Sequence, residues 1–174
     1  GSTGRGIPEV VSMDDSYYDV AQICQNGHVI NAMARYYPNI NQNYCDKCGA
    51  ATIMAWPACN TPIRGYYHVP GVFVSSHFVA PSYCYSCGKP FPWTKVALIA
   101  AQELADTLEA LSVEERLELK ESINHLLRET PRTRVAETKF KKLMRKAGKE
   151  AYDGMKSILT DIVSETAKRT LFGQ

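Results

Sequence analysis

The sequence predicts an α+β protein with two parts. Residues 13–93 are expected to form a small β-rich domain stapled by metal, and residues 94–174 an α-helical domain, a bundle of about four helices. Two observations predict this division. All six cysteines lie between positions 24 and 87, where cross-links can replace the large core that a small domain lacks. After Pro92, apolar residues recur at helical spacing.

The first twelve residues are interpreted as an appended tag or linker, with Met13 as a plausible native start. Residues 13–93 are rich in Tyr, Pro, Gly and Asn, and they favour short strands, including one within residues 69–79. No sustained helical period is present there. We therefore place the boundary between the two domains at residue 93.

Four helices are expected after that boundary. Thr94 is expected to cap the first, and Ser112 with Glu115 forms a capping box for the second, which would end near residue 128 and be closed by Pro131. A third helix is expected over residues 133–147, where Gly148 suits a left-handed cap. The fourth would run without interruption over residues 149–171. Such a series of amphipathic helices with short connections predicts a bundle.

The spacing of the cysteines predicts zinc. Cys45 and Cys48, and again Cys84 and Cys87, form C-x-x-C-G turns in which both sulfurs can face one ion. A secreted protein would more often use six cysteines in disulfides. Because no leader sequence and no apolar run of about 18 residues is present, we expect a cytoplasmic protein without a membrane span.

The remaining ligands are less regular. Cys24 and His28 resemble a looser turn, and sequential pairing gives a first zinc site of Cys24, His28, Cys45 and Cys48. Cys59 would then join Cys84 and Cys87 in a second site. A nested pairing of Cys45 and Cys48 with Cys59 is the less favoured alternative, since the connection is short.

The second site lacks a ligand, because Trp56 stands where the first sulfur of a C-P-x-C turn is expected. His68 or His77 could supply the fourth ligand, water could complete an open site, or the site could be empty and held by packing. We expect one firmly bound zinc and a second that is weak or absent.

The chain resembles a bacterial zinc-ribbon family that is classified as a domain of unknown function. The resemblance is carried by four motifs: residues 23–31, residues 62–67, residues 69–72, and the run from Cys84 to Thr94. It implies a pair of zinc ribbons followed by a helical region, with no established activity. It also implies a cysteine at the position of Trp56, so this chain departs from the family pattern there.

Catalysis is disfavoured. Asp46 is the sole carboxylate in residues 20–93, so the ribbon offers almost no general base, and the His-x-Glu of zinc deaminases is missing. A zinc hydrolase with an open three-cysteine site is a distant third interpretation. Nine tyrosines and Phe91 in this half could stack on bases, but packing around the metal is the commoner role of such rings.

Charge is polarised in the helical half, although the net charge is only +2. Seven acids between positions 103 and 121 face a later cluster of eight bases: Arg132, Arg134, Lys139, Lys141, Lys142, Arg145, Lys146 and Lys149. These two groups can complement each other within or between chains, or the bases can bind nucleic acid. We expect a non-enzymatic, zinc-stabilised interaction module that binds a protein partner or itself, with nucleic-acid binding through residues 132–149 as the alternative.

Overall fold

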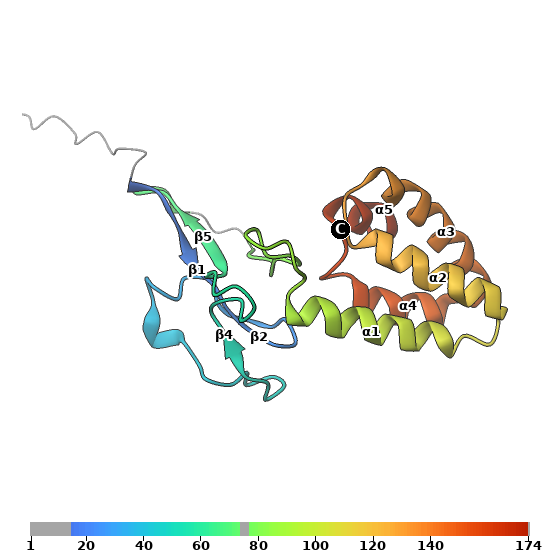
Figure 1. Ribbon diagram of the computed structural model, residues 1–174, viewed down its shortest axis with the longest axis horizontal. Helices are drawn as coiled ribbons and strands as arrows, with labels where there is room; N and C mark the ends of the chain where they lie inside the picture. The colour runs from blue at the N-terminus through green and yellow to red at the C-terminus, as the bar shows by residue number, and fades with distance from the viewer. Residues whose placement is uncertain (1–14, 74–76, 174) are drawn as a thin grey trace, which may run out of the picture.

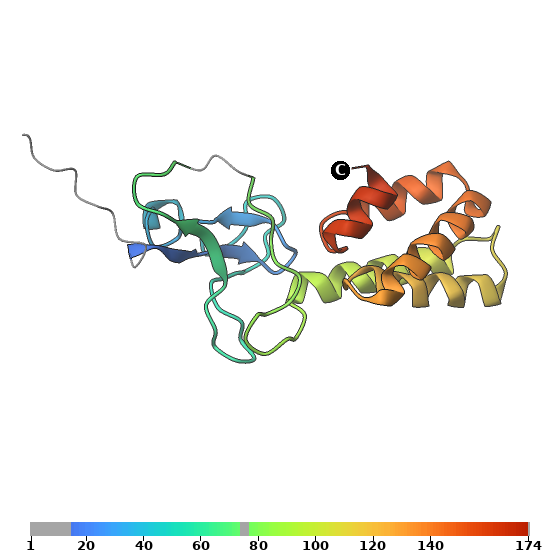
Figure 2. The same cartoon turned by 90° about the horizontal axis from the view of Figure 1, so that it is seen from above.

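The computed structural model describes residues 15–73 and 77–173. Figure 1 shows a β-rich part and a helical part, connected through helix α1 (Pro92–Asp106) and the loop before it. Figure 2, seen from above, shows the same two separate lobes. The predicted α+β fold class is confirmed.

Two small antiparallel sheets form the first lobe. Strand β1 (Tyr17–Val20) pairs with β5 (Arg64–His68), and β2 (Gln22–Cys24) lies between β3 (Val29–Asn31) and β4 (Thr52–Ile53). These strands are short, and a small apolar cluster fills the space beneath them. Its buried members are Ala21, Ile23, Trp56, Ile63, Cys84, Phe91 and Trp93.

The expected strand within residues 69–79 does not form among the residues that are described there. Val72 donates its N–H to the carbonyl of Val69, and Gly71 has a φ of 78°. Pro70 and Gly71 thus impose a turn where the apolar composition alone suggested extended chain. Residues 74–76 lie outside the description.

The second lobe contains five helices in the described chain, one more than about four. After α1 come α2 (Val113–Leu126), α3 (Pro131–Ala147), α4 (Lys149–Leu159) and α5 (Glu165–Phe172). Their inward faces form one continuous core that includes Phe140, Met155 and Leu159, all fully buried. Figure 1 shows α2 beside α3 and α4 beside α1.

The expected single last helix is divided in two. Residues 160–164 form a turn in which Ile162 and Val163 are buried, and the Ser164 hydroxyl accepts a bond from the Ala167 N–H to cap α5. The Ser164 N–H in turn donates to the carbonyl of Leu126 at 3.0 Å. The apolar stripe continues through the turn, so helical periodicity did not reveal the break.

Two helix starts also differ from expectation. Helix α1 begins at Pro92, and Thr94 donates its buried hydroxyl to the Ser82 carbonyl instead of capping the helix. Pro131 opens α3 after the N-cap Thr130, where proline's missing N–H costs nothing. The capping box of Ser112 and Glu115 is confirmed. Within the described ranges, no helix is both long enough and apolar enough to cross a membrane.

Candidate metal centres

The structure brings Cys24, His28, Cys45 and Cys48 together, with their ligand atoms within 4.8 Å of one another. Sγ of Cys24 lies 3.8 Å from Sγ of Cys48. Nδ1 of His28 lies 3.5 Å from the sulfur of Cys24 and 3.5 Å from that of Cys45. The imidazole therefore presents Nδ1 to the centre of the cluster.

These distances fit a tetrahedral ion. Bonds of about 2.3 Å to sulfur and about 2.0–2.1 Å to nitrogen separate two sulfurs by about 3.8 Å, and a sulfur from a nitrogen by about 3.6 Å. The measured distances in the first cluster agree with both values. These three distances are therefore the ones expected for ligands that share one ion of this size.

The two C-x-x-C-G turns share one backbone arrangement. In each, the first cysteine donates its N–H to the carbonyl five residues later, Cys45 to Ala50 at 2.8 Å and Cys84 to Lys89 at 2.9 Å. Glycine follows with a positive φ, 74° at Gly49 and 73° at Gly88. This conformation is costly for other residues, and it brings two sulfurs to one side of the turn.

Residues 56–60 adopt the same arrangement without the first thiol. Trp56 donates its N–H to the Thr61 carbonyl at 2.9 Å, and Asn60 donates to the Trp56 carbonyl at 2.8 Å. Asn60 has a φ of 58° and replaces the glycine, since asparagine tolerates this region better than most residues. The chain therefore forms the same turn here and places an indole at the position of the first cysteine.

Cys59, Cys84 and Cys87 form the second cluster, in which the sulfurs of Cys59 and Cys84 are 3.7 Å apart. This is again the separation of two sulfurs on a tetrahedral ion. Among the residues described, no carboxylate or imidazole joins them within the same 4.8 Å limit. The cluster supplies three of the four ligands that a closed structural site requires.

The two histidines considered as a fourth ligand lie elsewhere. His68 is at the end of β5, with its ring 5.0 Å from that of Tyr17 and 5.9 Å from that of Tyr36. His77 is exposed, and neither histidine belongs to the cluster of three cysteines. The nested pairing is wrong as well, because Cys45 and Cys48 lie with Cys24 and not with Cys59.

Polar neighbours lower the pKa of two of the thiols, and no sequence motif had indicated these neighbours. The side-chain amide of Asn26 donates to Sγ of Cys48 at 3.3 Å and lowers the pKa of that thiol to about 6. Thr61 Oγ1 lies 3.1 Å from Sγ of Cys59 and lowers its pKa to about 7. Burial raises the pKa of Cys24. Only the position of Asn26 between two ligands could have drawn attention to it.

Trp56 fills the space beside the incomplete cluster. Its side chain is 8% exposed, and its ring meets Phe91 edge to face with centroids 5.7 Å apart. Phe91 in turn stacks on Trp93 at 4.7 Å. Three aromatic rings thus form a continuous apolar support for the loop that carries Cys84 and Cys87.

The second cluster also lies at the junction of the two lobes. Trp93, in the first turn of α1, donates its indole N–H to the Pro81 carbonyl at 2.9 Å. Ser82 donates to the carbonyl of Ile162, between α4 and α5, at 3.1 Å. A metal ion bound by Cys59, Cys84 and Cys87 would therefore connect the first lobe to the loop around Ser82, which contacts the helices.

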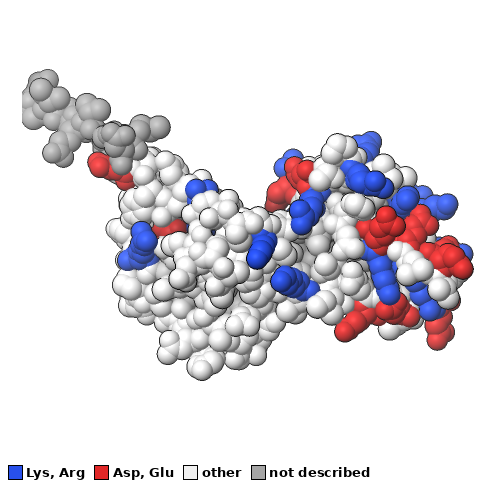
Figure 3. Space-filling view, in the orientation of Figure 1, with Lys and Arg blue, Asp and Glu red and all other residues white. Residues whose placement is uncertain are grey.

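The predicted basic cluster does not form one surface. Lys146 pairs with Glu115 at 2.7 Å and Lys139 lies 4.0 Å from Glu118, so α2 and α3 complement each other within the chain. Figure 3 shows acidic and basic side chains intermixed over the helices, whereas the visible face of the first lobe carries few charges. Lys141, Arg145 and Lys149 border a groove elsewhere on the bundle.

A family model described as an uncharacterized protein conserved in bacteria, DUF2321, matches residues 17–171. The chain belongs to this bacterial family. The match covers both clusters and all but the last residue of α5, so the DUF2321 region includes the β-rich lobe and the bundle together. No curated protein and no solved structure matches the chain.

Proposed function

We propose that this DUF2321 protein is a non-enzymatic, zinc-stabilised protein-interaction module of the bacterial cytoplasm. Zinc suits the first cluster because its three thiolates and one imidazole are the ligands of structural zinc sites. All four positions are filled by protein, which leaves no open position for substrate or water. In the reducing cytoplasm the thiols stay available for metal.

The observation that carries the interaction role is a group of exposed tyrosines around the β1–β5 sheet, called the tyrosine surface. It consists of five side chains that are 40–55% exposed: Tyr17, Tyr18, Tyr36, Tyr37 and Tyr67. Tyr18 and Tyr67 lie on one face of this sheet, and Tyr17 and Tyr36 flank His68 on the other. Tyr18 and Tyr67 contact across the sheet at 4.8 Å, and Tyr36 meets Tyr37 at 4.7 Å. Tyrosine is enriched in protein interfaces because it combines a large apolar area with a hydroxyl.

The sequence favoured packing of these rings around the metal, but the five side chains are about half exposed to solvent. Buried Asp19 holds the segment that carries Tyr36, since its carboxylate accepts bonds from the N–H groups of Arg35 and Tyr36. Arg64 lies over Tyr18 at 4.4 Å and over Tyr85 at 3.7 Å. The aromatic rings are thus fixed before binding, which lowers the entropic cost of association.

Nucleic-acid binding receives less support. Two of the eight predicted bases face acids of α2, and three others border a groove on the bundle. Among the described residues, the segments that carry the tyrosine surface contain two cations, Arg35 and Arg64, which is too few to follow a phosphate backbone. A protein surface is the partner that fits this balance of aromatic area and charge.

Site-specific photo-crosslinking in bacterial cells tests the proposal. A photoreactive phenylalanine analogue in place of Tyr67 should give discrete protein adducts, and Tyr18→Ser with Tyr36→Ser should weaken them. The same analogue in place of Val113, which is 66% exposed on the bundle, is the matched control. An adduct of twice the chain mass would identify a second copy as the partner. Adducts with nucleic acid alone, or equal adducts at both positions, would contradict the proposal.

A further inference from the structure

A groove at the end of the helical bundle has the composition of a ligand site. It has a volume of about 360 Å³, within the range of small-molecule sites. Its walls come from the end of α3, the start of α4 and the end of α5. The residues that line it are Phe140, Lys141, Met144, Arg145, Gly148, Lys149, Tyr152 and Leu171.

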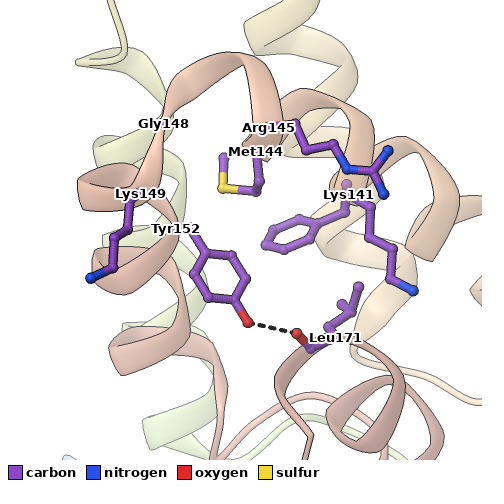
Figure 4. A pocket seen from close by; sticks show the side chains of 8 residues that line it. Lys141, Met144, Arg145, Gly148, Lys149, Tyr152 and Leu171 are labelled. Carbon is purple, nitrogen blue, oxygen red and sulfur yellow. Dashed lines mark hydrogen bonds between the residues drawn. The ribbon is translucent and has the colours of Figure 1, made fainter.

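The floor of the groove is apolar. Phe140, Met144 and Leu171 are buried members of the bundle core. The Tyr152 hydroxyl donates to the Leu171 carbonyl at 2.7 Å, as Figure 4 shows, so its polar end is already bonded and its ring serves as a wall. A ligand bound in the groove would therefore contact mainly carbon and sulfur atoms at its floor.

Three cations border this floor. In Figure 4, Lys141 and Arg145 lie on one side and Lys149 on the other. No acidic residue lines the groove, and within residues 15–73 and 77–173 none of the three cations makes an ion pair. Lys139 and Lys146, on the same helix, face α2 and its acids instead.

Two features concentrate positive charge at this groove. Lys141 and Arg145 are four residues apart on one helix face, where like charges repel. Helix α4 also follows its N-cap Gly148 with no side-chain cap, so its first N–H groups add positive potential beside the negative C-terminal end of α3. An anionic group above the groove would relieve both effects, and the floor would accept an apolar chain attached to it.

We propose that the groove binds an amphipathic organic anion, a carboxylate on a single alkyl chain. The chain lies on Phe140, Met144 and Tyr152, and the carboxylate meets Arg145 and Lys141. Arginine suits this position because its guanidinium can bind both carboxylate oxygens. This ligand is independent of the tyrosine surface, which lies on the other lobe.

Decanoate, below its micelle concentration, is a suitable probe. With ¹³C-methyl methionine in the full chain, decanoate should shift the Met144 methyl signal in a saturable way and leave those of Met33 and Met54, in the first lobe, unchanged. Decanol, which has the chain but no charge, should bind at least about tenfold more weakly, as expected when charged hydrogen bonds are lost.

A pair of double variants tests the role of the cations. Lys141→Gln with Arg145→Gln should weaken decanoate binding by at least about tenfold. Lys142→Gln with Arg134→Gln removes the same two residue types from the same helix outside the groove, and should keep the wild-type affinity. Unchanged Met155 signals show that each variant is folded.

Four results would overturn the proposal: no saturable shift at Met144, equal binding of decanol and decanoate, equal loss in both double variants, or a Met144 shift caused by phosphatidylglycerol vesicles and not by decanoate. The last result would point to a membrane surface in place of a single-chain anion.

Discussion

Trp56 occupies in its turn the backbone position that Cys84 occupies in the turn across the second cluster. Each donates its N–H to the carbonyl five residues later at 2.9 Å. The turn has therefore kept its shape where one thiolate is missing. Packing of the indole on Phe91 supplies part of the stability that a fourth metal bond would give.

Replacing Trp56 tests whether packing of its indole takes the place of a fourth metal ligand. Trp56→Cys should bind the second zinc much more tightly than the wild type, because a fourth thiolate completes the tetrahedron. Without metal, the same variant should lose about 3–5 kcal/mol of unfolding free energy through the lost indole. Zinc content after chelator competition and denaturant unfolding measure the two effects.

Trp56→Ala is the control, since it removes the indole and adds no ligand. It should share the loss of stability and show no gain in zinc. If the cysteine and alanine variants retained the same amount of zinc, Trp56 would not stand at a ligand position.

Glu115 makes the stability of the bundle depend on pH. The Lys146 ammonium and the N-cap Ser112 lower the pKa of Glu115 to about 2, from an ordinary 4.5. Because the folded pKa is depressed, this contribution is complete above about pH 4.5 and is lost as pH falls toward 2. Glu115→Gln should remove that part of the pH dependence.

Helical circular dichroism during denaturation, at several pH values, measures the effect. The difference between wild type and variant at each pH cancels the loss of metal in acid, which both proteins share. Glu114→Gln, at an exposed position in the same first turn, should leave the dependence unchanged. Equal pH profiles for wild type and Glu115→Gln would contradict the role of this capping carboxylate.

Glu137, in α3, is a buried carboxylate. Its side chain is 3% exposed, and within the described part of the chain its Oε1 has no hydrogen-bond partner. A buried, unpaired carboxylate oxygen is costly, so Glu137→Met should raise the unfolding free energy by about 1–3 kcal/mol. Denaturant unfolding measures it, with Glu121→Met as the exposed control. A loss of stability would show that Glu137 has a stabilising partner.

The C-x-x-C-G turns could be predicted from sequence because their geometry is local. A C-x-x-C-G segment needs only five residues to place two sulfurs, and the pairing of Cys24 with Cys48 needed no knowledge of the sheets. The capping box at Ser112 is local in the same way. The position of His68 was different, because it depends on the register of β5 with β1, which two pairs of consecutive tyrosines do not determine.

Features that depend on distant segments were missed. Thr94 was expected to cap a helix because threonine is common at that position. Its hydroxyl instead donates to the Ser82 carbonyl in the preceding loop, a contact that the local sequence does not indicate. The break before α5 depends on Ser164, whose N–H finds its acceptor at Leu126. The sequence also did not indicate that Asn60 takes the position of the glycine in the other two turns; its positive φ shows this.

Native mass spectrometry of the wild-type chain, purified with zinc and then treated briefly with a chelator, tests most directly the claim that the two clusters are unequal. One zinc ion should remain, held by the four-ligand cluster, and Cys45→Ser should lose it whereas Cys87→Ser should keep it. Two ions retained equally, or a retained ion that depends on Cys87 and not on Cys45, would contradict this account.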